Sequence, residues 1–407
     1  KQGANGVDNG RLWLDEVRIP RENLLNRLGD VAEDGTYSTS FATNGGRFMA
    51  MMDTLLAARI NVGYTGNNLA KLGLIITSRY LTTRRQFSLR PTEETALLDY
   101  PSVQRRLLPF VAKCYAYHWF SRKVFAKSVT LKEKVLAGTF QKSDQREMHM
   151  YAAASKVMGT YHQNDCLQIC RELCGGMGYH AENRVGVLLS DWHAHLTVDG
   201  TNLMLFQQVA KSVLDSHREV LMDSELREEF KQKLQREQAA LSSRISSSWC
   251  TDQGFLLALF ALRVNIRIVQ VAEEMQVHIM AGKGGRLAWD LSMDRVWALS
   301  VAWGELEVIR AFAGVLEDGT LKHLENRRVI NLLWQLTVMS FLERDQTWLC
   351  TTFSEHASVL QADLLRQLWS LSAAVRPLTA QLVNAFDIPD FMVAAPIAFD
   401  WHKRWAR

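Results

Sequence analysis

The stretch Cys174–Gln208 reads CGGMGYHAENRVGVLLSDWHAHLTVDGTNLMLFQQ, and the interpretation of the whole chain starts from it. It opens with three closely spaced glycines, Gly175, Gly176 and Gly178. Glycines let backbone approach a bulky ligand closely, and they also end helices. A single carboxylate, Asp199, follows on a turn before an apolar-rich helical pattern resumes, where it can act as a base or only cap that helix. The stretch therefore predicts two helix ends with candidate site residues between them.

Helical periodicity extends outward from this stretch in both directions. From about Arg47 to Leu214, apolar residues recur at spacings of three and four, with a proline-bounded break at 88–101. The pattern predicts four long helices, at about 47–80, 102–129, 143–173 and beyond Asp199. Such a series favours an antiparallel bundle. Further amphipathic helical runs are predicted around Leu256–Met280, Trp289–Ala313, Arg327–Phe341 and Ala362–Leu382.

Two segments have different patterns. Residues 1–35 alternate apolar and polar side chains after the turn signal Asp8-Asn9-Gly10, which predicts strand, turn and strand. The apolar positions are Leu12, Leu14, Val17 and Ile19. Two short strands cannot bury a face alone, so we expect this segment to be the edge of a larger sheet domain. Residues 217–250 are highly charged and end in serines, which predicts a solvated helix and a linker.

Composition excludes several classes of protein. The chain has 407 residues, of which 47% are hydrophobic and 22% charged, as is ordinary for a soluble protein of two or three domains. The net charge of +4 is too small, and the basic residues are too scattered, to indicate nucleic-acid binding. No apolar run is expected to reach the roughly 18 residues of a membrane span.

The cysteines and histidines do not predict a metal site. Cys166, Cys170 and Cys174 recur every four residues along one helix face, where small thiols pack against a neighbouring helix or could ligate a metal. His193 and His195 have no third ligand candidate nearby, so no metal is expected. Cysteine usage fits a reducing compartment.

Several ordered motifs together resemble one protein family. They are GVDNGRLWLDEVRIPRENLLNRLGDVAEDGTY near the start, RYLTTRRQF, LDYPSVQRRLLP, the Cys174–Gln208 stretch and NAFDIPDFMVAAPIA near the end. In this order they resemble the C-terminal part of the acyl-CoA oxidases, within the acyl-CoA dehydrogenase and oxidase superfamily. The resemblance is greatest to the plant and algal peroxisomal type, and it covers nearly the whole chain.

The resemblance implies a mainly α fold with four parts. Residues 1–40 correspond to the end of a middle β domain, and residues 45–216 to a flavin-binding, acyl-CoA dehydrogenase-like four-helix bundle. Residues 217–250 form a charged, serine-rich connection. Residues 251–407 correspond to the second helical domain that the oxidases have and the dehydrogenases usually lack.

The resemblance also implies an FAD site. Arg84, Gln86 and Phe87 match a motif that contacts the flavin dinucleotide, often that of the partner subunit, and a guanidinium suits a pyrophosphate. The alternative for Arg84 is a cation at a helix C-terminus. The further cofactor residues that it implies are Gln104, Gly175, Gly176, Thr201 and Asn202. Taken alone, Gln104 reads as a solvated helix residue.

Asp199 matches the position where the family normally carries a glutamate base. Aspartate is shorter by one methylene, about 1.5 Å of reach, and a misplacement of about 1 Å can reduce a rate on the order of a hundredfold. The cap-only role of Asp199 remains open beside the catalytic one. Arg59 and Gly178 are implied near the substrate, although Arg59 can equally form a structural ion pair.

The implied activity is oxidation of acyl-CoA by O₂ to trans-2-enoyl-CoA and H₂O₂ in fatty acid β-oxidation. The implied partners are acyl-CoA and a second copy of the chain in a homodimer. Peroxisomal localisation follows from the family, although the terminal Trp405-Ala406-Arg407 is not an S-K-L-type signal. The alternative is a truncated or degenerate relative that does not catalyse and acts as a binding or assembly subunit.

Overall fold

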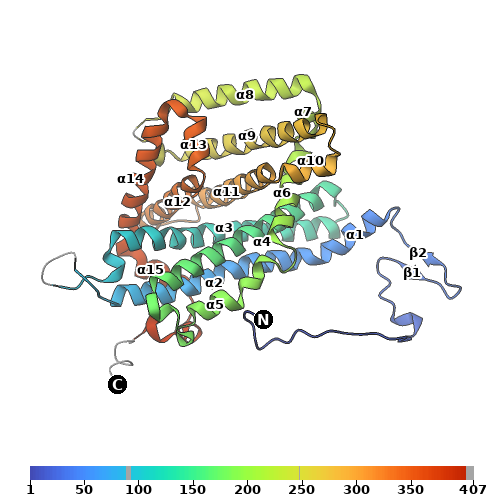
Figure 1. Cartoon of the computed structure of the whole chain (residues 1–407), viewed down its shortest axis with the longest axis horizontal. Coiled ribbons are helices and arrows are strands. Elements are labelled where there is room, and N and C mark those ends of the chain that lie inside the picture. The colour runs from blue at the N-terminus through green and yellow to red at the C-terminus, as the bar shows by residue number, and fades with distance from the viewer. Residues whose placement is uncertain (89–92, 247, 400–407) are drawn as a thin grey trace.

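Four long helices form the centre of the protein, which a computed structural model describes over residues 1–88, 93–246 and 248–399 (Figure 1). They are α2 (Leu56–Thr83), α3 (Pro101–Leu136), α4 (Lys142–Leu173) and α6 (Asn202–Ser216). A short α1 (Asn44–Met52) leads into α2, and α5 (Val185–Asp191) lies between α4 and α6. The predicted four-helix bundle is therefore confirmed, although the first predicted helix is divided into α1 and α2 by a 3-10 turn at Asp53–Leu55, and α3 continues to Leu136.

Glycines bring α2 and α4 into unusually close contact. A Cβ atom on Gly63 would lie 2.4 Å from the Ser155 carbonyl oxygen, and one on Gly159 would lie 2.4 Å from the Gly63 oxygen. Further along, a Cβ on Gly73 would collide with Leu167. The contacts follow the same order along both helices, so α2 and α4 run parallel. Backbones approach this closely only where side chains are absent. The cysteine face of α4 also lies on α2, because Cys166 contacts the Ala70 carbonyl.

The helices after α6 form a second set, most of which is stacked on one side of the bundle (Figure 1). They are α7 (Arg218–Met222), α8 (Ser224–Ser242), α9 (Gln253–Met280), α10 (Gly285–Leu291), α11 (Met293–Glu317), α12 (Leu324–Arg344), α13 (Gln346–Thr352), α14 (Ala357–Val375), α15 (Thr379–Asn384) and α16 (Asp390–Val393). The α8 helix packs on α9, α9 packs on α11, and α11 packs on α3, α4 and α6. The layers therefore continue without a gap from the bundle to α8.

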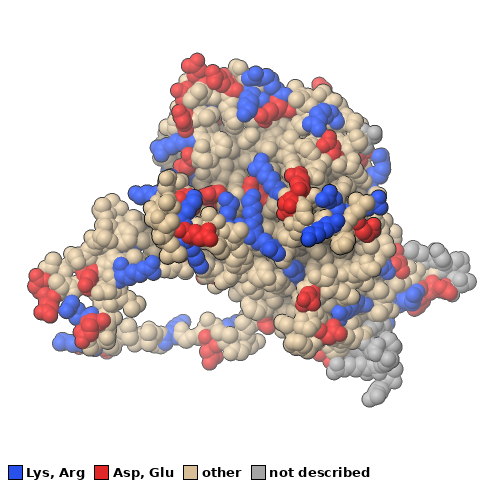
Figure 2. Space-filling view, turned by 180° about the vertical axis from the view of Figure 1, so that it is seen from behind, with Lys and Arg blue, Asp and Glu red and all other residues tan. Residues whose placement is uncertain are grey.

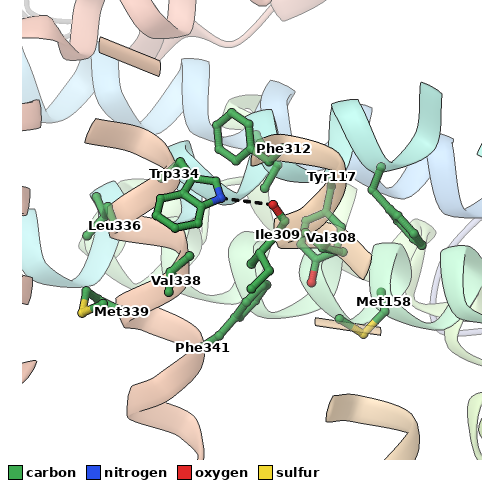
Figure 3. Close-up of a cluster of buried hydrophobic side chains, with 14 of the residues drawn as sticks. Tyr117, Met158, Val308, Ile309, Phe312, Trp334, Leu336, Val338, Met339 and Phe341 are labelled. Atoms are coloured by element: carbon green, nitrogen blue, oxygen red, sulfur yellow. Dashed lines mark hydrogen bonds between the residues drawn. The ribbon is translucent and has the colours of Figure 1, made fainter. Parts of the chain in front are cut away.

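A close-packed apolar core joins the two sets of helices (Figure 3). Trp334 of α12 is completely buried, and its indole Nε1 donates to the Ile309 carbonyl of α11 at 3.1 Å. Phe312, Val338 and Phe341 are also fully buried. Each large apolar side chain buried in this way contributes about 1.5–3 kcal/mol, so the second domain is fixed on the bundle.

A buried carboxylate adds a polar clamp to this contact. Glu307 of α11 accepts hydrogen bonds from Lys123 Nζ of α3 at 2.7 Å and from Tyr151 Oη of α4 at 2.7 Å. Arg310 adds a third contact from within α11 at 3.1 Å. Burial alone would raise the pKa of Glu307, but its cationic and hydroxyl partners lower it below the ordinary value. Glu307 is therefore an ionised group shared by three helices.

The most apolar helix, α9, is long and apolar enough to cross a membrane, contrary to the expectation from the sequence. Of its most apolar window, 56% is buried inside the protein. Its Arg263 is 1% exposed and forms an ion pair with Glu305 of α11 at 2.5 Å. Burial against α11 explains the composition, because a helix that is apolar on most sides lies inside a large protein or a membrane.

The N-terminal prediction was wrong in its details. The strands are β1 (Asp30–Val31) and β2 (Tyr37–Ser38), an antiparallel pair in which Asp30 lies opposite Ser38. Residues 10–20 form no strand, and Leu12 and Trp13 are 83% and 76% exposed. The physical reason is that alternation creates a strand only when another strand and an apolar layer receive its apolar face.

The connection at 217–250 holds α8, whose Leu234 and Leu241 are buried in the core beside α9, so this helix is only partly solvated. Among the serines that follow α8, Ser243, Ser246 and Ser248 lie in turns or bends. The terminal Trp405-Ala406-Arg407 lies outside the described residues. On the face seen in Figure 2, basic and acidic side chains are interspersed, in keeping with the small net charge.

Candidate active site

Asp199 lies on a strained turn immediately before α6. Its φ is 55° and that of Gly200 is 108°, so two consecutive residues have left-handed backbone. For a residue other than glycine this conformation costs on the order of 1 kcal/mol or more. The N-cap of α6 is Thr201, and its side chain makes no capping bond. Asp199 is therefore not the helix cap, and the cap-only alternative is wrong.

Two buried cations hold the carbonyl groups of this turn. Arg59 of α2 is 2% exposed, and its Nε donates to the Asp199 carbonyl at 3.1 Å. Lys156 of α4 is 0% exposed, and its Nζ donates to the Gly200 carbonyl at 3.0 Å. The strained turn is thus fixed from two different helices. Asp199 itself is partly exposed, so its carboxylate remains accessible.

Lys156 also anchors the first residue of α6. Its Nζ donates to Asn202 Oδ1 at 2.7 Å, and Asn202 Nδ2 donates to Thr160 Oγ1 at 3.1 Å. Burial lowers the pKa of Lys156 to about 8, with Asp199 acting in the opposite direction and Arg59 lowering it further. Asn202, predicted as a cofactor residue, is 3% exposed and occupied by these internal bonds. Thr201 is exposed beside it.

A neutral histidine supports the same region. His195 Nδ1 lies 2.8 Å from Gln163 Oε1, and because an amide oxygen only accepts, the proton is on Nδ1. Gln163 Nε2 in turn donates to the Trp192 carbonyl at 3.1 Å. Burial, with a smaller contribution from Lys156, lowers the pKa of His195, although Asp199 opposes this. The segment leading to Asp199 is therefore tied to α4.

The predicted dinucleotide motif lies where α2 ends. Arg84 is the C-cap residue, and its backbone N–H donates to the Tyr80 carbonyl at 2.8 Å, as the helix-terminus alternative also requires. The next residues run extended, and Gln86 N–H donates to the Thr95 carbonyl at 3.1 Å. Phe87 has a φ of 58°, and its ring is 76% exposed. An exposed aromatic ring on strained backbone is typical of a ligand-contacting segment.

The glycine block ends α4 at the same end of the bundle. A Cβ on Gly175, whose φ is 57°, or on Gly176 would meet nothing within 4 Å, so open space lies beyond this backbone. A Cβ on Gly178 would come within 2.3 Å of the Arg171 carbonyl oxygen. Gly178 is therefore required by packing inside the turn. Gly175 follows the C-cap residue Cys174 and has the left-handed backbone of a helix-ending glycine, so the helix-end alternative holds, whereas contact of Gly175 and Gly176 with a ligand stays a prediction.

Gln104, near the start of α3, is also at this end. Its side chain is 7% exposed, and its Nε2 donates to the Leu98 carbonyl at 3.1 Å. It is a buried residue that stabilises the turn before α3, and not the solvated residue that its sequence context suggested. Its bond to a cofactor stays a prediction.

The structure therefore separates the predicted site residues into two groups. The base end contains Asp199, Arg59, Thr201 and Asn202, and the glycine end contains Arg84, Gln86, Phe87, Gln104, Gly175, Gly176 and Gly178. From Arg59 to Thr83, α2 rises about 36 Å at 1.5 Å per residue. Gly178, predicted near the substrate, does not lie with Asp199.

The sequence did not point to Lys156. A lysine within a helix usually lies at the surface, and no motif marked it. One feature of the sequence could have indicated that Lys156 is buried. It directly follows a run of small residues, Ala152–Ser155, which allows close packing of helices. The base end can thus present one accessible carboxylate on a turn that has little freedom to move.

Comparison with known proteins identifies the family that this chain resembles. The family of the acyl-CoA oxidase C-alpha1 domain matches residues 52–214, and the acyl-CoA oxidase family matches residues 252–400. Acyl-coenzyme A oxidase 3, peroxisomal, of Arabidopsis thaliana is 32% identical over 409 residues, which cover 98% of this chain and 58% of that protein. The chain thus spans less than two thirds of this relative's length.

Solved structures share the fold. Acyl-CoA oxidase 3 from Yarrowia lipolytica superposes with a TM-score of 0.82 at 20% identity, covering 100% of this chain and 59% of its own. Acyl-CoA oxidase-2 of Caenorhabditis elegans, solved with FAD, ascaroside-CoA and ATP, gives 0.78 at 22% identity and covers 97% of this chain and 58% of its own. Since acyl-CoA oxidase families match both of its helical parts and a relative aligns along almost all of it, the chain belongs to the acyl-CoA oxidase family.

Proposed function

We propose that the protein is an FAD-dependent acyl-CoA oxidase, which converts acyl-CoA and O₂ to trans-2-enoyl-CoA and H₂O₂. The observation that carries the proposal is the turn at Asp199, the position of the family's base, where Arg59 and Lys156 bind the main-chain carbonyls of Asp199 and Gly200 and so fix the backbone that carries the carboxylate. A fixed carboxylate is what removal of a proton from the carbon next to a thioester carbonyl requires.

The role of the chain in this reaction is to hold and move one proton. The Asp199 carboxylate accepts the proton from the substrate α-carbon, and the bonds to Arg59 and Lys156 keep its backbone in place while it does so. Bound FAD would supply an acceptor for the β-hydrogen as hydride and would pass the electrons to O₂. Asp199 therefore needs no second acid or base for this step.

The glycine end fits an anionic, planar cofactor such as FAD. Arg84 offers a guanidinium for a pyrophosphate, Phe87 offers an exposed ring, and Gly175 and Gly176 leave open space beside their backbone. Gln86 lies in the same extended segment. These residues would hold the cofactor, whereas Gln104 supports the turn beneath them.

The separation of the two ends favours a homodimer. A cofactor site needs both the base and the residues that bind the dinucleotide. Asp199 and Arg84 of one chain cannot form one such site together, because they lie at opposite ends of α2, about 36 Å apart along its axis. In a two-fold dimer with antiparallel bundles, the glycine end of one subunit meets the base end of the other. Each site would then combine Arg84 from one subunit with Asp199 from its partner.

The reaction is tested with purified protein that contains this chain. We expect a yellow FAD-bound form that releases peroxide when acyl-CoA is added, and an Asp199→Asn variant that binds FAD but produces no peroxide. The Asp199→Glu variant restores the family's usual base and should keep activity. A native protein that stays colourless in excess FAD would contradict the proposal and favour a non-catalytic binding or assembly subunit.

We propose a peroxisomal location, because the Arabidopsis thaliana relative is named peroxisomal. Co-localisation of the tagged protein with a peroxisomal marker tests this. A diffuse distribution of the tagged natural protein would count against it.

A further inference from the structure

The turn that carries Asp199 is strained, and two buried cations bind its carbonyl groups. Asp199 and Gly200 both have left-handed backbone, with φ values of 55° and 108°. Such a conformation persists only when the surroundings fix it. The two successive carbonyl groups accept one bond each from a buried cation, Arg59 Nε at 3.1 Å and Lys156 Nζ at 3.0 Å.

Lys156 has a second function that Arg59 lacks. The helix α6 starts without a side-chain cap. Lys156 Nζ does not replace that cap, because an ammonium only donates, but it binds Asn202 Oδ1 at 2.7 Å, at the first residue of the helix. One buried ammonium therefore joins the strained turn to the helix that follows it.

The position of Lys156 is set by the glycine contact between α2 and α4. The Ser155 carbonyl oxygen would lie 2.4 Å from a Cβ on Gly63, so the two backbones touch beside Lys156. Arg59 lies about one helical turn before Gly63 on α2, some 6 Å along the axis. The same contact therefore sets the spacing of both cations that grip the turn.

We propose that Lys156 is a positioning residue, which keeps the Asp199 carboxylate in its reactive place by binding the Gly200 carbonyl and the Asn202 side chain. Its effect on turnover rests on the proposed oxidase function, whereas its effect on the turn does not. Lys156 donates from a completely buried position on α4, and its two bonds are to Gly200 and Asn202, which follow Asp199 in the chain.

Hydrogen–deuterium exchange and kinetics on Lys156→Met test the proposal. Methionine keeps the length and the apolar stem but removes the three donors. In the 407-residue chain, the peptide covering residues 199–208 should exchange about tenfold faster, as expected for loss of a hydrogen bond to a charged group. In the FAD-bound enzyme, kcat should fall about 10- to 100-fold, with KM for acyl-CoA changed less.

Lys113→Met is the matched control. Lys113 of α3 is also buried, at 8% exposed, and burial lowers its pKa to about 8 as it does for Lys156. Its ammonium lies over the rings of Phe110 and Phe341, and not on the carbonyl groups of the Asp199 turn. The control should leave both the 199–208 exchange rate and kcat near the native values.

Each outcome decides the proposal. Unchanged exchange of the 199–208 peptide in Lys156→Met overturns it, as does equal acceleration in Lys113→Met. If Asp199→Asn abolishes turnover while Lys156→Met leaves kcat intact, the oxidase function stands and this proposal fails. If the native enzyme does not turn over, the exchange measurement still tests the turn. Should Lys156→Met not fold, Asn202→Ala removes one of its acceptors and must accelerate the same peptide.

Discussion

Arg59 Nε donates to the backbone carbonyl of Asp199 at 3.1 Å, although the two residues are 140 positions apart in the chain. The contact joins the first long helix of the bundle to the turn that precedes the last. Burial lowers the pKa of Arg59, while Asp199 raises it, yet the ordinary value is so high that the guanidinium stays charged. The candidate base is thus attached through its main chain, which leaves its carboxylate available.

Replacing Arg59 should therefore reduce the rate of turnover, and not only the stability of the folded protein. In Arg59→Met, the turn loses one of its two cationic donors, and we expect kcat to fall about 10- to 100-fold with FAD binding retained. The control is Arg79→Met on the same helix, which removes a surface ion pair with Asp390. Steady-state peroxide production measures both. Equal rates for the two variants would show that the turn does not depend on Arg59.

The contact between α2 and α4 should not tolerate a methyl group. In Gly159→Ala, the new Cβ would lie 2.4 Å from the Gly63 carbonyl oxygen, and such overpacking costs about 1–3 kcal/mol. The comparison is Gly314→Ala in α11, where a Cβ meets nothing within 4 Å and the change should be neutral or stabilising. Chemical denaturation of both variants tests this. A Gly159→Ala protein as stable as native would contradict the glycine contact.

Glu307 should make stability depend on pH in the acid range. Its pKa in the folded protein is below the ordinary 4.5, so its contribution is present above the unfolded pKa and is lost as pH falls through the folded value. Because Lys123 and Arg310 are partly exposed, Glu307→Gln should lower the free energy of unfolding by about 1 kcal/mol at pH 7, with a smaller difference below pH ~4. Glu325→Gln, in a largely exposed pair with Arg328, should change little. If the free energies of unfolding of the native protein and of Glu307→Gln change in parallel from neutral to acid pH, Glu307 does not stabilise the contact between the helices through its charge.

The helical framework could be predicted from the sequence because its cause is local. Apolar spacing of three and four residues specifies a buried helix face, and α4 and α9 begin and end within a few residues of the predicted limits. The strands near Leu12 and Trp13 were mispredicted because a strand depends on partners elsewhere. The same periodicity could not show that the glycines of α2 and α4 meet, since pairing of helices is not a local property.

The site was predicted only in part, and for the same reason. Asp199 and Arg59 were found through the family motif, but their contact through the main chain was not. Lys156 was missed because a lysine in a helix is normally solvated, whereas here it is 0% exposed. Sequence proximity also suggested that Gly178 and Asp199 belong together, and the structure places Gly178 where α4 ends, against Arg171.

Mixing two inactive variants tests the central claim, that the two ends of the bundle serve different cofactor sites of a dimer. Subunits with Arg84→Glu and subunits with Asp199→Asn, each inactive alone, are combined so that mixed dimers form, which two different affinity tags verify. A mixed dimer has one site with both substitutions and one with neither, so the mixture should recover about a quarter of native activity. Verified mixed dimers that recover no activity would contradict the account.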